Sequence, residues 1–189
     1  MTTENLKTHD QFDGGLMANT GTGEHAKATG QYVVECFDKD GNLKWSEKTH
    51  NLVVNVGLQY MAGVALTSTT QITAWYIGLY GAASSNNPAA TDTLAIHAGW
   101  TEITPYSGSR PSATFAAATN ANPSVVTNSA SKASFSINAT ATVGGAFLCS
   151  ASSGTTGTLF SAADFQSPGD RSVVSGDVLT VTYTFSLSA

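Results

Sequence analysis

The chain has 189 residues, a length that suits one domain with some additional chain. Charged residues make up only 11% of it, and its net charge is −5. Its 8 lysine and arginine residues are too few for the basic stripe that nucleic acid requires, so we expect no direct nucleic-acid partner and no electrostatic attachment to a membrane.

The first thirty residues differ from the rest of the chain. They are polar and glycine-rich, with scattered apolar side chains at Leu6, Phe12, Leu16 and Met17. A segment of this composition buries too little apolar surface to offset its own ordering entropy. We therefore expect a flexible, extended N-terminal arm over 1–30 that becomes ordered on a neighbouring molecule, and a folded domain over 31–189. A terminus without a role is the alternative.

The first regular structure that the sequence predicts is a β-hairpin. Two segments rich in strand-forming residues, Tyr32–Phe37 and Leu43–Lys48, flank the turn sequence Asp38–Asn42, which contains an Asp-Gly pair. The acidic turn does not match a calcium loop. Gly41 is the fourth residue from Asp38, whereas an EF-hand loop places its glycine sixth.

One helix is expected, over Asn55–Leu66. Asn55 is a residue type that caps helices, and apolar residues follow at near-helical spacing: Val56, Tyr60, Met61 and Val64. We expect this helix to pack against a sheet rather than to form a site.

The middle of the chain alternates between extended and irregular segments. Ile72–Tyr80 is a dense run of strand formers and predicts a buried strand. A loop is expected over 81–91, then a short helical turn at Leu94–His97 capped by Asp92, and then an extended segment, Trp100–Thr104.

The second half has the clearest strand pattern. Apolar and polar residues alternate over Ala133–Thr140 and, more strictly, over Leu179–Leu187, where the turn pair Gly176-Asp177 precedes the alternation. Ala146–Cys149 and Gly157–Phe160 provide two further apolar segments. Several short strands separated by turns predict an all-β fold, a β-sandwich or jelly-roll-like domain with one short helix.

No motif predicts catalysis, and we expect no catalytic, cofactor-binding or metal-binding residue. The 4 histidines have no metal-ligand spacing among themselves or with the 2 cysteines. Cys36 and Cys149 favour two buried free thiols, although a bridge between them stays open. Ser129–Lys132 has the S-x-x-K spacing of penicillin-recognising enzymes but lacks their other motifs.

Two kinds of side chain leave alternatives open. Acidic residues could pair across the fold as in a glycosidase, but turn carboxylates are the simpler interpretation of Glu102, Asp164, Asp170 and Asp177. The three tryptophans are candidate packing or interface anchors: Trp45, Trp75 and Trp100. A sugar-binding face that they form with nearby tyrosines is the alternative.

Several strings of residues are more specific than the strand and turn patterns. They are Phe37–Trp45, His50–Leu58, Ala74–Leu79, Asp92-Thr93 with His97–Glu102, Ser129–Ala133 leading to Ile137–Thr140, Gly157–Phe160 and Arg171–Asp177. Together these strings resemble small structural proteins of tailed bacteriophages and prophages. The resemblance covers about 32–189 and leaves out the arm.

This resemblance implies a virion component without a catalytic residue or cofactor. It implies a capsid decoration or cement protein, made in the host bacterial cytoplasm, that binds the major capsid protein on the exterior of the head and contacts further copies of itself. A tail or neck component, a receptor- or carbohydrate-binding module, and a cell-wall hydrolase are the alternatives. The resemblance leaves the position on the particle, the oligomeric state and the interface residues open.

Overall fold

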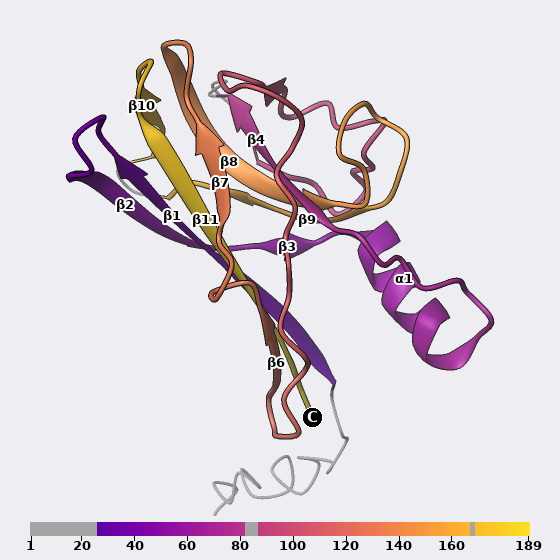
Figure 1. Ribbon diagram of the computed structural model, residues 1–189. Coiled ribbons are helices and arrows are strands. Elements are labelled where there is room, and N and C mark those ends of the chain that lie inside the picture. The colour runs from indigo at the N-terminus through magenta and orange to yellow at the C-terminus, as the bar shows by residue number, and fades with distance from the viewer. Residues whose placement is uncertain (1–25, 82–86, 167–168) are drawn as a thin grey trace, which may run out of the picture.

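The computed structural model describes residues 26–81, 87–166 and 169–189. They form two antiparallel β-sheets packed face to face, with one α-helix beside them (Figure 1). The prediction of a mainly β, sandwich-like domain with one short helix is therefore confirmed.

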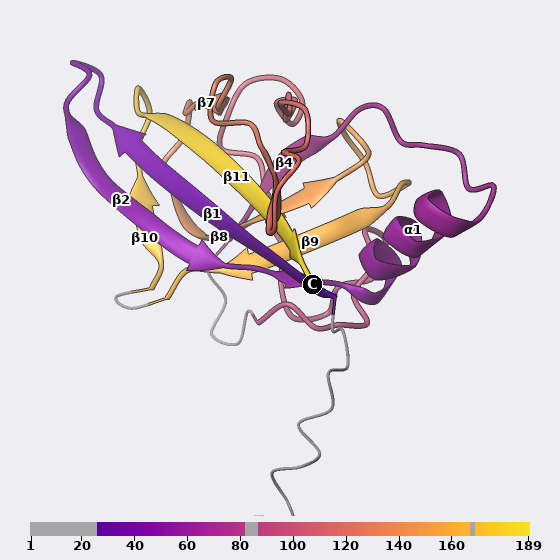
Figure 2. The same cartoon turned by 90° about the horizontal axis from the view of Figure 1, so that it is seen from below.

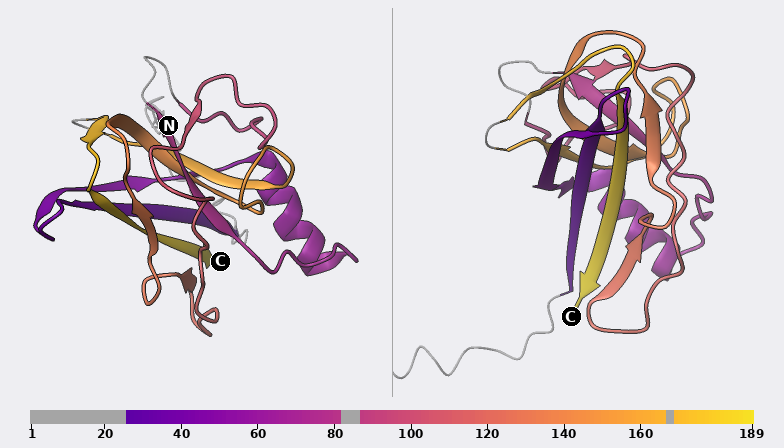
Figure 3. Two further views of the ribbon diagram at one scale, coloured as in Figure 1. Left: turned by 45° about the horizontal axis from the view of Figure 1, so that its top comes forward. Right: turned by 60° about the vertical axis from the view of Figure 1, so that its left-hand side comes forward.

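The first sheet joins the two ends of the described chain. Its central pair is β1 (Lys27–Phe37) and β11 (Val178–Ser188), which run side by side along their length (Figures 2 and 3). The order is β2-β1-β11-β6, with β2 at Leu43–His50 and β6 at Ser124–Thr127. The strand β7 (Ala133–Ser136) also pairs with β11.

The second sheet has the order β3-β9-β8-β4-β5. Its members are β3 (Leu52–Val53), β9 (Leu159–Asp164), β8 (Ala141–Cys149), β4 (Tyr76–Gly81) and β5 (Glu102–Ile103). The short strand β10 (Arg171–Val173) pairs with the first three residues of β8, Ala141–Val143.

The main core lies between the sheets. Alternate side chains of β1 and β11 point inward and are fully buried, among them Val34 and Val181, which are opposite each other in the ladder. A second apolar cluster covers the other face of the second sheet, where Leu94 and Trp100 pack on Phe147 and Leu159. The second sheet is thus buried on both faces, which explains why β8 is apolar without alternation.

The local turn predictions are confirmed. In the β1–β2 hairpin, one Asp38 carboxylate oxygen accepts the amides of Asp40 at 2.9 Å and Asn42 at 2.8 Å. Gly41 has a φ of +84°, which favours glycine. The predicted turn before the last strand also forms, with Gly176 at a φ of +95°.

Three predictions about the middle of the chain are wrong. No helical turn forms at Leu94–His97, because the Leu94 side chain packs in the second apolar cluster. Asp92 caps nothing there; its carboxylate instead accepts the Ala89 amide and the Trp100 indole N–H. The strand predicted from Ile72 begins only at Tyr76, since Ile72–Trp75 lie outside the sheet.

The boundaries of the arm and of the helix also differ from the prediction. The strand β1 begins at Lys27, so the last residues of the arm predicted over 1–30 belong to the first sheet. The rest of that prediction, 1–25, lies outside the described residues, as do 82–86 of the predicted loop. Asn55 is the first residue of the helix, and Val54 occupies the cap position without a side-chain hydrogen bond.

Candidate protein-interaction site

The helix α1 (Asn55–Leu66) carries no charged residue, and its first turn lies directly against the sandwich. The Val54 amide donates to the Phe160 carbonyl of β9 at 3.2 Å, and the Asn55 amide donates to the Ala90 carbonyl at 2.8 Å. Gly57 lies so close to β9 that a Cβ at this position would stand 2.3 Å from the Phe160 carbonyl oxygen. Glycine therefore allows the helix to begin directly against the sheet.

Beyond its first turn the helix extends away from the sheets (Figure 1). Gly57 is its only fully buried residue. Leu58 is 44% exposed and Leu66 is 86% exposed, and the alanines at 62 and 65 are exposed as well. These four residues recur at helical spacing and define what we call the outer face of α1. The outer face is apolar, uncharged and open to solvent.

The opposite side of α1 borders an apolar hollow of about 210 Å³, which we call the aromatic groove. No lining residue carries a charge. Trp75, Phe115 and Phe185 are half-buried there, whereas the side chain of Leu148 is buried. The lining residues are Tyr60, Met61, Trp75, Phe115, Val126, Leu148, Phe160, Tyr183 and Phe185.

Edge-to-face ring contacts hold the groove in shape. The Trp75 ring contacts Tyr60 of α1 and Phe160 of β9, each at 5.5 Å between centroids. Phe160 in turn contacts Phe185 of β11 at 5.5 Å. The Tyr60 hydroxyl also accepts the Ile72 amide at 2.8 Å. These contacts join α1 to both sheets, and aromatic pairs of this geometry add stability beyond their buried area.

A buried hydroxyl network fixes the inner end of the groove. The Tyr32 and Ser161 hydroxyls lie 2.9 Å apart, and the Ser161 hydroxyl donates to the Tyr183 hydroxyl at 3.3 Å. The Asn51 amide also donates to Tyr183, at 2.9 Å. Burial raises the pKa of Tyr183, so its hydroxyl stays protonated. The network connects the two sheets and sets the position of a groove-lining ring.

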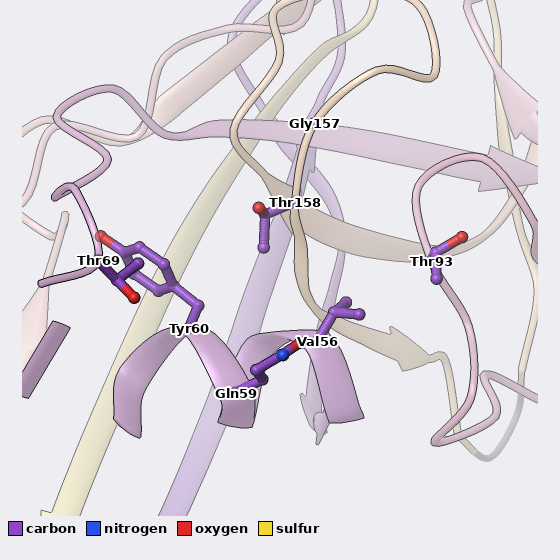
Figure 4. Close-up of a pocket in the computed structure, with 7 residues that line it drawn as sticks. All are labelled: Val56, Gln59, Tyr60, Thr69, Thr93, Gly157 and Thr158. Carbon is purple, nitrogen blue, oxygen red and sulfur yellow. The ribbon is translucent and has the colours of Figure 1, made fainter. Parts of the chain in front are cut away.

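A second hollow, of about 390 Å³, lies on another side of α1 (Figure 4). Figure 4 shows Val56, Gln59 and Tyr60 of the helix facing Thr158 and Thr69 across it. Its rim is richer in hydroxyl groups than that of the aromatic groove, and Tyr60 borders both hollows. The helix therefore borders a hollow on two of its sides.

The three tryptophans occupy three different environments. Trp100 is only 3% exposed; it stacks on His97 and belongs to the second apolar cluster. Trp45 is half-buried and donates its indole N–H to the Ser172 carbonyl at 3.2 Å. Trp75 lines the aromatic groove. Of the three candidate anchors, only Trp75 lies at the site described above.

No pattern in the sequence pointed to the buried arginine that packs at β5 of the second sheet. Arg110 is 3% exposed and forms two hydrogen bonds of 2.6 Å with the Glu102 carboxylate. It also donates to the carbonyls of Ala151 and Gly154, each at 2.8 Å. Its guanidinium lies 5.2 Å from the centroid of the Phe147 ring. This arrangement gives every nitrogen of the group a partner and serves packing.

Three of the four acidic residues considered for catalysis are held in structural contacts, and the fourth, Asp170, is exposed and acts through its charge on Asp164. Asp177 is paired with Lys44 at 2.6 Å, Glu102 is held by Arg110, and Asp164 accepts the Tyr80 hydroxyl at 3.3 Å. Burial raises the pKa of Asp164. These contacts give Glu102, Asp164 and Asp177 structural roles.

The prediction of two buried free thiols, Cys36 and Cys149, is confirmed. Within the described ranges, no group of three or more His, Cys, Asp or Glu side chains could hold a metal ion. The described part of the chain also contains no helix long and apolar enough to cross a membrane.

Comparisons of the chain with protein-family models, with curated proteins and with solved structures found no match.

Proposed function

We propose that the chain is a structural subunit of a tailed-bacteriophage virion, a decoration or cement protein that binds the outside of the shell formed by the major capsid protein. The sequence strings that resemble phage structural proteins support this assignment. The geometry adds a surface suited to assembly, and the proposal gives the chain no catalytic role.

The observation that carries the proposal is the outer face of α1. A helix without charged residues is normally buried, yet Leu66 is 86% exposed in the free subunit and Leu58 is 44% exposed. An exposed apolar patch on a soluble domain marks a surface that another molecule covers. A protein partner fits better than a charged ligand, because this face offers apolar contacts and no charge.

The physical effect of such binding on a shell follows from mass action. A subunit that binds only the assembled lattice shifts the equilibrium towards the closed shell and raises its stability. A standard interface buries about 800 Å² on each partner, a small part of the 11327 Å² that this chain exposes. Enough surface therefore remains for a second contact, with a neighbouring capsid subunit or with another copy of this chain.

The test is co-assembly with purified capsid shells. The subunit is mixed with shells before and after expansion, the bound copies are counted, and the thermal melting of the shells is followed. Saturable binding that raises the melting temperature is the expected result. Absence of binding to every form of the shell would contradict the proposal, and the subunit would then be sought in isolated tails and necks, where the alternative places it.

A further inference from the structure

We propose that an extended, uncharged segment of another polypeptide adds a strand beside the chain that leads into β4. The receiving surface is a hollow of about 500 Å³ between Gln71–Trp75 and Ser112–Phe115, which we call the strand fork. No residue of the outer face of α1 lines it. The test uses no capsid shell, so this inference holds or fails independently of the proposed function.

One edge of β4 is paired along two stretches and open along a third. Its last residues pair with β5. Beside them, the Ile77 amide donates to the Pro111 carbonyl at 3.0 Å, and the Ala113 amide donates to the Trp75 carbonyl at 2.8 Å. An antiparallel pair of this kind exchanges two bonds, but within the described residues the Trp75 amide donates to no acceptor. The ladder therefore ends at Trp75.

The two rims of the strand fork separate because they are held by different parts of the fold. The segment after Ala113 turns to the first sheet, where the Ala116 amide donates to the Thr127 carbonyl of β6 at 3.0 Å. The other rim is held by α1, since the Ile72 amide donates to the Tyr60 hydroxyl at 2.8 Å. Both rims are therefore fixed by contacts outside the hollow.

Main-chain groups on both rims lack a partner. Successive residues of an extended chain direct their amides and carbonyls to opposite sides. Because Ile72 bonds towards α1, Thr73 is directed into the fork; the same alternation directs Phe115 into it from the other rim, since Ala113 bonds to Trp75. In the part of the chain that the structure describes, the main-chain groups of Thr73 and Phe115 form no hydrogen bond. A polypeptide strand offers the complementary amides and carbonyls.

The first rim has the sequence of a strand. Ile72–Tyr80 is a dense run of strand-forming residues, yet the strand begins only at Tyr76. A local preference that the fold leaves unmet is expected at functional positions. A partner strand in the fork would give Thr73 the ladder that its sequence favours.

The fork has the size and chemistry for about three residues of an uncharged strand. One strand residue takes about 160 Å³, from a rise of about 3.3 Å, a strand spacing of about 4.8 Å and a sheet spacing of about 10 Å. Neither rim carries a charged residue, so a charged side chain of the occupant would lose hydration without gaining a partner. Trp75 and Phe115 also line the aromatic groove. The groove therefore offers an apolar pocket for one side chain of the entering strand.

The test uses the full-length protein and the synthetic peptide acetyl-Thr-Val-Thr-Phe-Thr-Val-Thr-amide. Hydrogen exchange of the protein amides is followed by NMR while the peptide is titrated. Saturable binding should slow exchange of the Thr73 and Phe115 amides about tenfold at about nine-tenths occupancy, because they then exchange only from the free fraction. The Ile72 amide is the internal control and should change much less, since it is already bonded to Tyr60.

Two changes test the geometry. An N-methyl group on the phenylalanine amide of the peptide removes one hydrogen bond and should weaken binding about fivefold. Thr114→Arg places a charge in the fork and should weaken binding about tenfold or more. Ala117→Arg is the matched control, because Ala117 is exposed like Thr114 but does not line the fork.

Absence of saturable binding would overturn the inference. So would binding that is indifferent to N-methylation, because main-chain pairing would then play no part in it. An equal loss in Thr114→Arg and Ala117→Arg would place the peptide elsewhere on the surface and would overturn the inference as well.

Discussion

Truncation of the outer face of α1 should weaken partner binding strongly and leave the fold intact. Leu66→Ala removes three carbon atoms from a side chain that is 86% exposed in the free subunit. Nearly all of its transfer free energy is therefore available to a partner, about 2 kcal/mol at about 0.8 kcal/mol per methylene group. Since 1.4 kcal/mol is a factor of ten, binding should weaken by about 30-fold.

Leu58 is 44% exposed, so Leu58→Ala should cost about half as much, about 1 kcal/mol or fivefold. The double variant should lose about 150-fold if the two positions act independently. The stability of the subunit should fall by about 1 kcal/mol, because the buried part of the Leu58 side chain is lost as well and the higher helix propensity of alanine offsets only part of this loss.

The assay is equilibrium binding of labelled subunit to capsid shells, with urea denaturation of the free subunit alongside. Leu43→Ala is the matched control: Leu43 is 55% exposed, but it lies on β2, away from α1 (Figure 1). Unchanged binding of the double variant would refute the assignment of the outer face. An equal loss in the control would refute it as well, since the effect would then be unspecific.

Three further predictions concern stability and reactivity. Glu102→Gln leaves the buried Arg110 with an uncompensated charge and should destabilise the fold by about 3 kcal/mol. In calorimetry this corresponds to a fall in Tm of about 6–12 °C. An unchanged Tm would show that the ion pair is dispensable for stability. Burial raises the pKa of Asp177, but hydrogen bonds from Lys44 and a backbone amide reverse this and leave it below its ordinary value. The resulting stability is present above the unfolded-state pKa and is lost as the pH falls through the folded-state pKa. The urea midpoint of the unchanged protein should therefore fall at acid pH, and Asp177→Asn should make this fall smaller. Burial raises the pKa of Cys36 to about 12, so a thiol reagent at pH 8 should label neither cysteine until denaturant is added; rapid native labelling would contradict the buried position.

Elements with one buried face were readable from the sequence. The strict alternation over Leu179–Leu187 corresponds to β11, whose inward residues Leu179, Val181 and Tyr183 are fully buried. The β1–β2 hairpin was readable for another reason, since its turn is determined by contacts within five consecutive residues, Asp38–Asn42. In both cases the deciding interactions are visible in a short stretch of sequence.

Elements whose environment depends on distant chain were not readable. Covered on both sides, β8 and β9 show no alternation, and the covering residues Leu94 and Trp100 come from a loop far from them in sequence. The edge strand β6 was missed because two apolar residues, Val125 and Val126, are too few to give a period. Its position is determined by pairing with β11.

The candidate site was readable only in part. The sequence showed that Asn55–Leu66 is a helix without charge, and the expectation that it packs against a sheet is confirmed by Gly57, Tyr60 and Met61. The close contact at Gly57 fixes where the helix begins, and the contacts of Tyr60 with Trp75 and Ile72 hold its direction afterwards, which no pattern in the sequence predicts. The aromatic groove combines residues from segments as distant as Tyr60 and Phe185, so no spacing rule could have brought them together.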